Sequence, residues 1–150
     1  MKLTIKGTPV AMQRHRTRVV NKSFGHNYLP KKSKDFKKVI QNEYIKKYKV
    51  KPYFNSKEDE YYLNLNTYVK IPKSYTKKRR KEIIEKGLRP NKKPDIDNYL
   101  KIVMDALNEY AYIDDAQITS IKVEKNYCES EEDERIEIYI AKEDKKWVIT

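Results

Sequence analysis

The chain has 150 residues, which fits one domain, and its 34 Lys and Arg residues against 22 Asp and Glu residues give a formal net charge of +12. With 38% apolar and 37% charged residues it can build one modest core. Three glycines, one cysteine and no apolar run of about 20 residues exclude collagen, a disulfide scaffold and a membrane span. With no apolar leader at the N-terminus and a single Cys128, we expect a cytoplasmic protein with one domain over residues 1–150.

Positive charge is concentrated in the first part of the chain. Residues 1–93 carry 27 basic and 7 acidic residues, whereas residues 94–150 carry 7 basic and 15 acidic residues. A Lys-rich surface that keeps the protein soluble is one explanation, but such a surface normally mixes both signs of charge. Clustering favours contacts with nucleic-acid phosphates. The expected DNA-binding residues are Arg14, Arg16, Arg18, Lys77, Lys78, Arg79, Arg80, Lys92 and Lys93.

The first elements follow from the hydrophobic pattern. Leu3 and Ile5 alternate with polar residues and predict a short strand. Residues 8–32 have no consistent period, so we expect a long basic loop there. Ser33 is predicted to cap a helix over residues 34–49. The apolar face of that helix comprises Phe36, Val39, Ile40, Tyr44 and Tyr48.

The middle of the chain alternates between strand and helix patterns. Residues 61–69 have a period of two and predict a strand. A short, very basic helix is expected over residues 74–86, followed by a basic linker over 88–94. A second amphipathic helix is expected to begin at Asp95. Its apolar stripe comprises Ile96, Leu100, Val103, Met104 and Leu107.

Two further strands are expected near the C-terminus, separated by an acidic turn over residues 128–134. In the first of them the alternation slips once, between Ile118 and Ile121. The apolar residues of the two strands are Ile118, Ile121, Val123, Ile136, Ile138 and Ile140. The order of the elements predicts an α+β fold, a small two-layer domain with helices on one face of a mixed or antiparallel sheet.

Acidic residues gather between positions 95 and 115 of this basic chain. They are Asp95, Asp97, Asp105, Asp114 and Asp115. Asp97, Lys101 and Asp105 are four residues apart and therefore share a helix face. A compact turn can bring the last two carboxylates back beside the helix start. Such a set of oxygen donors suits Mg²⁺, which supports phosphodiester hydrolysis, and Lys101 can place a positive charge on the same phosphate.

Each part of this set also has a simpler explanation. Asp95 can be an N-cap, which contributes about 1 kcal/mol. Asp97, Lys101 and Asp105 can form a solvated ladder of ion pairs, each contributing about 0.2–0.5 kcal/mol. Asp114 and Asp115 can be turn formers. Their concentration within one short segment favours the metal site over three unrelated structural roles.

The same segment resembles the signature of the RusA-type Holliday junction resolvases, in particular their phage and prophage branch. The matching residues are Pro94-Asp95-Ile96-Asp97-Asn98, Lys101, Asp105-Ala106-Leu107 and Asp114-Asp115-Ala116-Gln117-Ile118. Weaker similarity extends to residues 7–14 and 71–75. The resemblance implies a RusA-like domain and an enzyme of DNA recombination and repair, encoded by a bacterium or prophage.

This resemblance also implies roles for individual residues. Asp95, Asp97 and Asp115 would be the catalytic, metal-binding carboxylates, with Asp114 as second choice, and Lys101 would be the essential lysine. Family members use Mg²⁺, for which Mn²⁺ can substitute. They act as homodimers that cut four-way DNA junctions by paired symmetric nicks, without a membrane partner. The alternatives are a metal-dependent nuclease for other branched DNA or RNA, and a non-catalytic nucleic-acid-binding protein.

Several aromatic residues lie among basic ones and could stack on unpaired bases. They are Phe24, Tyr28 and Tyr75. Because the chain has 13 tyrosines, packing is the favoured role for these residues. Trp147 is expected to pack against the domain or at a dimer contact.

Two further features have expected roles outside the metal site. His15 and His26 lie in the basic loop, where surface or phosphate contacts are favoured over metal ligation. The acidic turn over Glu129–Glu134 would repel DNA, so we expect it on the face away from the junction.

Overall fold

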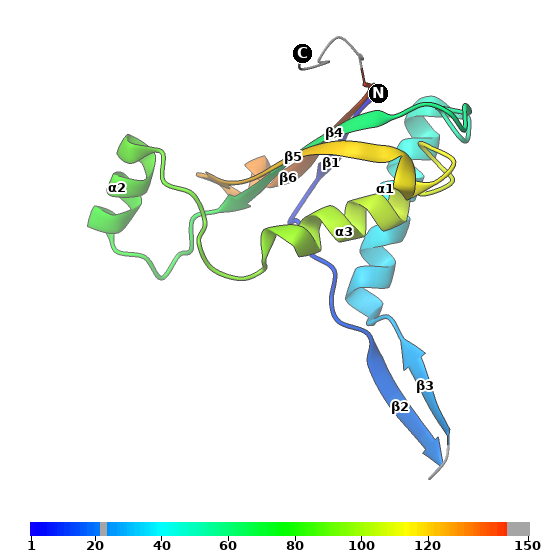
Figure 1. The fold of residues 1–150 in the computed structure, drawn as a ribbon. Helices are drawn as coiled ribbons and strands as arrows, with labels where there is room; N and C mark the ends of the chain where they lie inside the picture. Colours follow the sequence, from blue (N-terminus) through cyan, green and yellow to red (C-terminus); the bar gives the residue numbers. More distant parts are fainter. Residues whose placement is uncertain (22–23, 144–150) are drawn as a thin grey trace, which may run out of the picture.

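A computed structural model describes residues 1–21 and 24–143 (Figure 1). Trp147 lies outside the described residues. The strands are β1 (Lys2–Lys6), β2 (Arg16–Asn21), β3 (Phe24–Tyr28), β4 (Tyr61–Lys70), β5 (Ile118–Cys128) and β6 (Arg135–Lys142). The helices are α1 (Lys31–Tyr48), α2 (Lys77–Lys86) and α3 (Ile96–Leu107), with short 3₁₀ turns η1 (Asp115–Gln117) and η2 (Glu131–Asp133).

Four strands form a mixed sheet in the order β1-β6-β4-β5. β6 pairs antiparallel with both β1 and β4, and β4 pairs parallel with β5. The predicted alternation is confirmed, because one face of the sheet is buried. Its buried residues include Leu3, Ile5, Leu63, Leu65, Ile136, Ile138 and Ile140. α1 and α3 cover this face (Figure 1), so the domain has the expected two-layer α+β fold.

The slip in the alternation near Ile118 corresponds to a β-bulge. Tyr61 pairs with Ile118, but the next residue, Tyr62, pairs with Ser120. Thr119 is therefore the extra residue on β5, and an extra residue reverses the sides on which the following side chains lie. The irregular sequence pattern is thus a property of the strand itself.

α1 begins two residues before the expected cap. Pro30 precedes the helix, and Ser33 lies inside its first turn with no exposed surface. The Ser33 hydroxyl accepts a hydrogen bond from the Gln13 amide at 2.9 Å and donates to the Ala11 carbonyl at 3.4 Å. The prediction that Ser33 caps the helix was wrong, because this hydroxyl holds the segment before β2 instead.

A β-hairpin replaces most of the long loop expected over residues 8–32. β2 and β3 pair antiparallel, with Arg16 opposite Tyr28 and Arg18 opposite His26. The hairpin projects away from the sheet and the helices (Figure 1). Its described side chains are all exposed, so neither face imposes an apolar alternation on the sequence. This is why the pattern predicted a loop.

The two remaining helices occur where they were expected, but the first residue of α2 and the buried face of α3 differ from the prediction. α2 begins at Lys77, later than predicted, because Thr76 is its N-cap and accepts from the Arg79 amide at 3.2 Å. The buried residues of α3 are Tyr99, Ile102, Val103, Ala106 and Leu107. The predicted stripe is therefore rotated, and Ile96 at its start is 41% exposed. No helix in the described part of the chain has the length and apolar character of a membrane span.

Candidate functional site

Asp95 occupies the N-cap position of α3 without acting as a side-chain cap. An N-cap aspartate normally accepts a hydrogen bond from an amide two or three residues later. Here the Asp95 carboxylate makes no such bond, and it is the backbone carbonyl of Asp95 that accepts from the Asn98 amide at 3.2 Å. The carboxylate is exposed and remains available for another ligand. Capping alone does not account for this residue.

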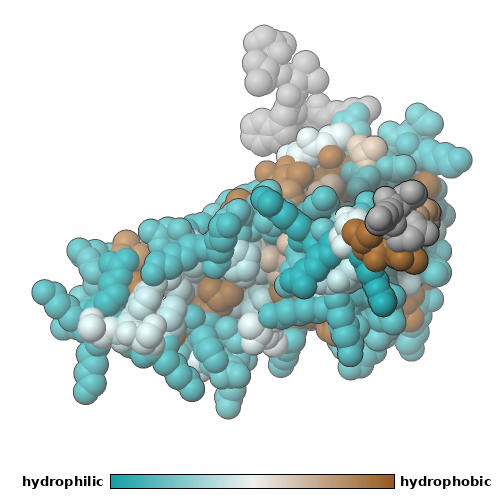
Figure 2. Space-filling model, turned by 90° about the horizontal axis from the view of Figure 1, so that it is seen from below, coloured by the Kyte–Doolittle hydropathy of each residue, from teal (hydrophilic) through white to brown (hydrophobic). Residues whose placement is uncertain are grey.

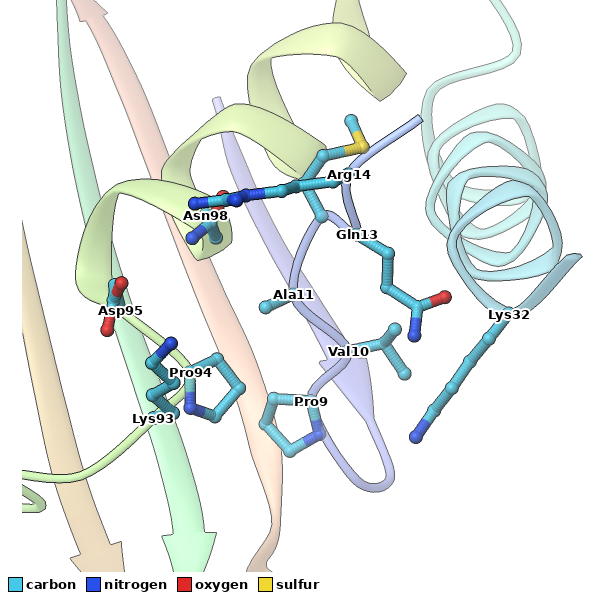
Figure 3. A pocket seen from close by; sticks show the side chains of 11 residues that line it. Pro9, Val10, Ala11, Gln13, Arg14, Lys32, Lys93, Pro94, Asp95 and Asn98 are labelled. Atoms are coloured by element: carbon cyan, nitrogen blue, oxygen red, sulfur yellow. The ribbon is translucent and has the colours of Figure 1, made fainter. Parts of the chain in front are cut away.

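The segment before the hairpin passes beside this helix start. The Met12 amide donates to the Asn98 carbonyl at 2.9 Å, which fixes the two segments together. Between them lies a pocket of about 410 Å³ (Figure 3). Asp95 and Lys93 lie on one side of it, the Arg14 side chain extends alongside Asn98, and Lys32 lies on the opposite side. Two expected DNA-binding residues, Arg14 and Lys93, thus line the same pocket as Asp95.

A second hollow of about 670 Å³ lies between the basic linker and β5. Its charged lining residues are Arg89, Lys92, Lys93, Asp95, Glu124 and Lys125. The Lys125 ammonium group donates to the carbonyls of Lys92 and Pro94, at 2.6 and 2.7 Å, and so holds the linker against the strand. Lys93 and Asp95 line both hollows. We call the two hollows together the basic cleft.

Asp97 and Lys101 are exposed on α3, and the ladder of ion pairs that was the simpler explanation for them is not formed. Within residues 1–21 and 24–143, no ion pair involves Asp97, Lys101 or Asp105. Ion pairing along the helix therefore does not explain these residues, although Asp97, in the first turn of α3, favours the helix through its dipole. Asp105 differs from the other two because it is half-buried.

The adjacent residues Asp114 and Asp115 have different surroundings. The Asp114 carboxylate accepts from the Ala116 amide at 2.8 Å, and the Gln117 side chain accepts from the Asp114 amide at 3.2 Å, which forms a capping box. Asp114 is thus occupied in forming the turn. Asp115 is the first residue of η1 and is half-buried.

Tyr112 shows where Asp115 lies relative to α3. Its buried hydroxyl donates to the Met104 carbonyl at 2.9 Å, near the C-terminal end of the helix. Burial raises the pKa of the Tyr112 phenol, and the negative charges of Asp115 and Asp105 raise this pKa further. Asp115 therefore lies near the Asp105 end of α3.

The structure thus separates the carboxylates that were expected to meet. Asp97 and Asp105 are eight residues apart, or about 12 Å along the helix axis. Among the described residues, no group of three or more His, Cys, Asp or Glu side chains is close enough to hold a metal ion. The connection after α3 does not return Asp114 and Asp115 to the helix start, because β5 begins beside the other end of the helix (Figure 1).

Asp95 and Asp97 nevertheless offer suitable donors for a hard cation. Mg²⁺ in nucleotide-processing sites is commonly held by one or two carboxylates, together with waters and substrate phosphates. Asp95 has no side-chain cap bond, and neither carboxylate forms an ion pair within the described ranges. The carboxylate oxygens at the helix start are therefore suitable ligands for Mg²⁺. They do not by themselves complete the coordination of the ion.

The other expected DNA-binding residues lie at two distant places. Arg16 and Arg18 are on the hairpin, whereas the basic residues of α2 are at the opposite end of the molecule (Figure 1).

Most of the α2 cations have partners within the domain. Arg79 pairs with Glu82 at 2.7 Å, Lys81 pairs with Glu85 at 3.6 Å, and Arg80 donates to the carbonyls of Ile71 and Pro72 at 3.3 Å. Lys77 and Lys78 are exposed at the start of the helix.

The aromatic residues divide between packing and exposure. Tyr75 packs as expected, since Lys92 lies 5.6 Å from its ring centre and a hydrogen bond with Tyr127 lowers the pKa of Tyr75. For Phe24 and Tyr28 the packing prediction was wrong, because they are 62% and 42% exposed.

Sequence reasoning missed part of the site and did not foresee the role of Glu134. Lys32, Arg89 and Lys125 line the basic cleft, yet no motif in the sequence sets them apart from the other basic residues. Glu134, at the end of the acidic turn, is buried and accepts from the Thr8 hydroxyl at 2.7 Å and the Lys70 amide at 3.0 Å. It has a structural role.

Comparison with known proteins agrees with the sequence motif. The profile of the family described as Endodeoxyribonuclease RusA matches residues 6–141. The chain is also similar to a Bacillus subtilis (strain 168) protein named "Uncharacterized protein YqaN", with 37% identity over 142 residues, covering 93% of this chain and 94% of the relative. The residues matched by the family profile include the helix start, the basic cleft, β4, β5 and nearly all of β6. The chain belongs to the RusA endodeoxyribonuclease family.

Proposed function

We propose that this protein is a Mg²⁺-dependent endonuclease that resolves four-way DNA junctions by paired symmetric nicks, acting as a homodimer in DNA recombination and repair. The family match over residues 6–141 supports DNA cleavage. The observation that carries the proposal is the Asp95 carboxylate, which lies without a capping bond inside a cleft lined by Arg14, Lys93 and Lys125. A twofold dimer suits a junction whose two cuts are related by a twofold axis.

We assign the chemistry to the start of α3. Asp95 and Asp97 would hold Mg²⁺, or Mn²⁺ in its place, whereas Asp115, near the other end of the helix, has no part in this set. The bound ion would supply an acidified water and neutralise charge on the phosphate. Lys101, one turn after Asp97 on the exposed side of the helix, would place a positive charge beside the scissile phosphate.

The basic cleft would hold the phosphates that flank the cut. Arg14 and Lys93 line one hollow, and Lys92 and Lys93 line the other, in which Arg89 pairs with Glu124 at 3.3 Å and Lys125 is bonded to the linker carbonyls. Contacts with phosphates fix the position of DNA without reading its sequence. We therefore expect recognition of DNA shape rather than base sequence.

A protein that only binds nucleic acid is the second candidate. In that case the exposed carboxylates of Asp95 and Asp97 would weaken binding, because they repel phosphates from the most basic part of the surface. A metal ion removes this conflict, since it attracts both the carboxylates and the phosphate. This electrostatic argument favours the enzyme.

The proposal is tested by cleavage of a mobile four-way junction, a flap and a linear duplex of the same sequence, with Mg²⁺, Mn²⁺ or EDTA. Mapping each cut at nucleotide resolution reveals whether the nicks are paired. We expect metal-dependent, symmetric cleavage of the junction at a rate well above those of the flap and duplex. Equal rates on all three substrates would contradict junction selectivity, and cleavage in EDTA would contradict metal dependence.

A further inference from the structure

The β2–β3 hairpin is an exposed arm that the proposed function does not yet use. Its residues from Arg16 to Val20 and from Phe24 to Tyr28 are all exposed, and it projects from the body of the domain (Figure 1). Besides the ladder, it is held together by a 2.6 Å hydrogen bond between the Thr17 hydroxyl and the Asn27 side chain. An arm that contributes no buried surface to the core must be explained by what it contacts outside the domain.

The stem of the hairpin suits contact with phosphates. Arg16 pairs with Tyr28, and Arg18 pairs with His26. Directly opposite residues project from the same face of a two-stranded ladder, so this face presents two guanidinium groups and two aromatic rings. No acidic residue occurs in the first 34 positions of the chain. The arm and the segments that lead into it from both sides therefore carry no negative charge that would repel a polyanion.

The tip of the hairpin has the opposite character. Val19, Val20 and Phe24 are 72%, 64% and 62% exposed, the three largest exposures among the large hydrophobic residues of the described chain. Figure 2 shows hydrophobic atoms gathered at this tip, beside the residues drawn in grey. Proteins that unstack DNA insert apolar side chains such as Phe, Leu and Ile between base steps, next to cations that hold the DNA.

The position of the stem connects the arm to the basic cleft. Arg14 lines the pocket that contains Asp95, and the hairpin begins two residues later at Arg16. The five residues of extended strand from Arg16 to Val20 span about 14 Å. The grooves of B-DNA are about 7.5–8.5 Å deep. An arm of this length can reach the floor of a groove while the basic cleft stays in contact with the DNA backbone.

We propose that the β2–β3 hairpin is a DNA-unstacking arm, in which Arg16 and Arg18 hold phosphates while Phe24, Val19 and Val20 insert between bases next to the cut. The location of insertion, the branch point of a four-way junction, rests on the proposed function. A second copy of this chain is the competing occupant of the tip. Charge favours DNA, because two such arms, each without acidic residues, would repel one another.

The test uses DNA that carries 2-aminopurine, a base whose fluorescence rises when it is unstacked. One probe is at the branch point of a junction and another is at the same sequence in a linear duplex, both in EDTA so that no strand is cut. The full-length protein is compared with Phe24→Ala, Val20→Thr and Phe24→Leu. Val50→Thr is the matched control, since Val50 is 49% exposed but lies after α1, outside the hairpin.

We expect fluorescence to rise when the wild-type protein saturates the junction, and Phe24→Ala and Val20→Thr to lose most of this rise. Loss of an inserted aromatic ring should weaken junction binding by roughly tenfold. Phe24→Leu, which keeps an apolar wedge, and Val50→Thr should behave as wild type. The midpoint of thermal unfolding should not change in any variant, because all the substituted side chains are exposed.

Saturated binding without a fluorescence rise, or an equal rise with Phe24→Ala, would overturn the proposal. A change from dimer to monomer in Phe24→Ala, measured by sedimentation, would assign the tip to a subunit contact instead. The Mg²⁺ cleavage assay described for the proposed function, run apart from the fluorescence assay in EDTA, keeps the two proposals distinguishable. Equal cleavage of junction and duplex would refute junction selectivity, while the loss of unstacking in Phe24→Ala would still support the arm.

Discussion

Ser33→Ala tests how the segment that carries Arg14 is held beside α3. The Ser33 hydroxyl is fully buried, accepts from the Gln13 amide at 2.9 Å and donates to the Ala11 carbonyl at 3.4 Å. Alanine removes both contacts without adding any group that could clash. The half-buried Gln13 amide then has no acceptor from this side chain, so the change isolates the anchoring role of one hydroxyl.

The size of the effect follows from two opposing contributions. Leaving a buried amide without its acceptor costs about 1–3 kcal/mol. Alanine favours the helix over serine by about 0.5 kcal/mol, which offsets part of this cost. We therefore expect the free energy of unfolding to fall by about 0.5–2.5 kcal/mol. For a domain of this size, each kcal/mol corresponds to a decrease of about 2–4 °C in Tm.

Urea unfolding measures this loss, and amide hydrogen exchange locates it. We expect the urea midpoint to decrease and the Gln13 amide to lose its protection. Ser130→Ala is the control, because its hydroxyl donates to Asp133 at 2.6 Å on the exposed surface, where loss of the bond should change stability by less than about 0.5 kcal/mol. An unchanged midpoint with a protected Gln13 amide in Ser33→Ala would refute the anchoring role.

Three further outcomes follow from the structure. Burial raises the pKa of Tyr44 to about 12 and also raises the pKa of Tyr112, so ionisation of these phenols favours the unfolded chain. The contribution of both tyrosines to stability should therefore be complete below about pH 10 and be lost at higher pH. Urea midpoints measured against pH should decline less steeply in Tyr112→Phe than in the wild-type protein. Lys93→Gln should weaken DNA binding and reduce the slope of log affinity against log salt by about one; a slope equal to that of wild type would exclude a phosphate contact. Thr76→Ala should destabilise α2 by about 1 kcal/mol, because it removes the acceptor for the Arg79 amide; hydrogen exchange confined to α2 would detect this, and unchanged protection would contradict it.

The sheet and the helix near the motif could be predicted because burial imposes a period on the sequence. β4 and β6 each bury one face, so the alternation of Leu63 and Leu65, and of Ile136 and Ile138, is visible in the sequence. The hairpin could not be predicted in this way, because it has no buried face. Its ladder is specified by backbone hydrogen bonds, which leave no signature in residue type.

The candidate site was predicted in part, for a different physical reason. The motif placed Asp95 and Asp97 at the start of a helix, and the structure does so. Local sequence cannot show which distant segments lie beside that helix. The approach of Arg14 depends on the Met12–Asn98 hydrogen bond, and Lys125 reaches the linker from β5. Asp115 shows the same limitation, since its position depends on where β5 begins.

The most direct test of the account compares cleavage and binding of a mobile four-way junction by the wild-type protein, Asp97→Asn and Asp114→Asn in Mg²⁺. Asp114→Asn is the matched control, because asparagine can keep the capping bond to Ala116 that Asp114 makes. The account predicts that Asp97→Asn cuts at least about a hundredfold more slowly while binding the junction as tightly as wild type or more tightly, and that Asp114→Asn cuts normally. Cleavage by Asp97→Asn at the wild-type rate, or loss of its binding together with its cleavage, would contradict the assignment of catalysis to the start of α3.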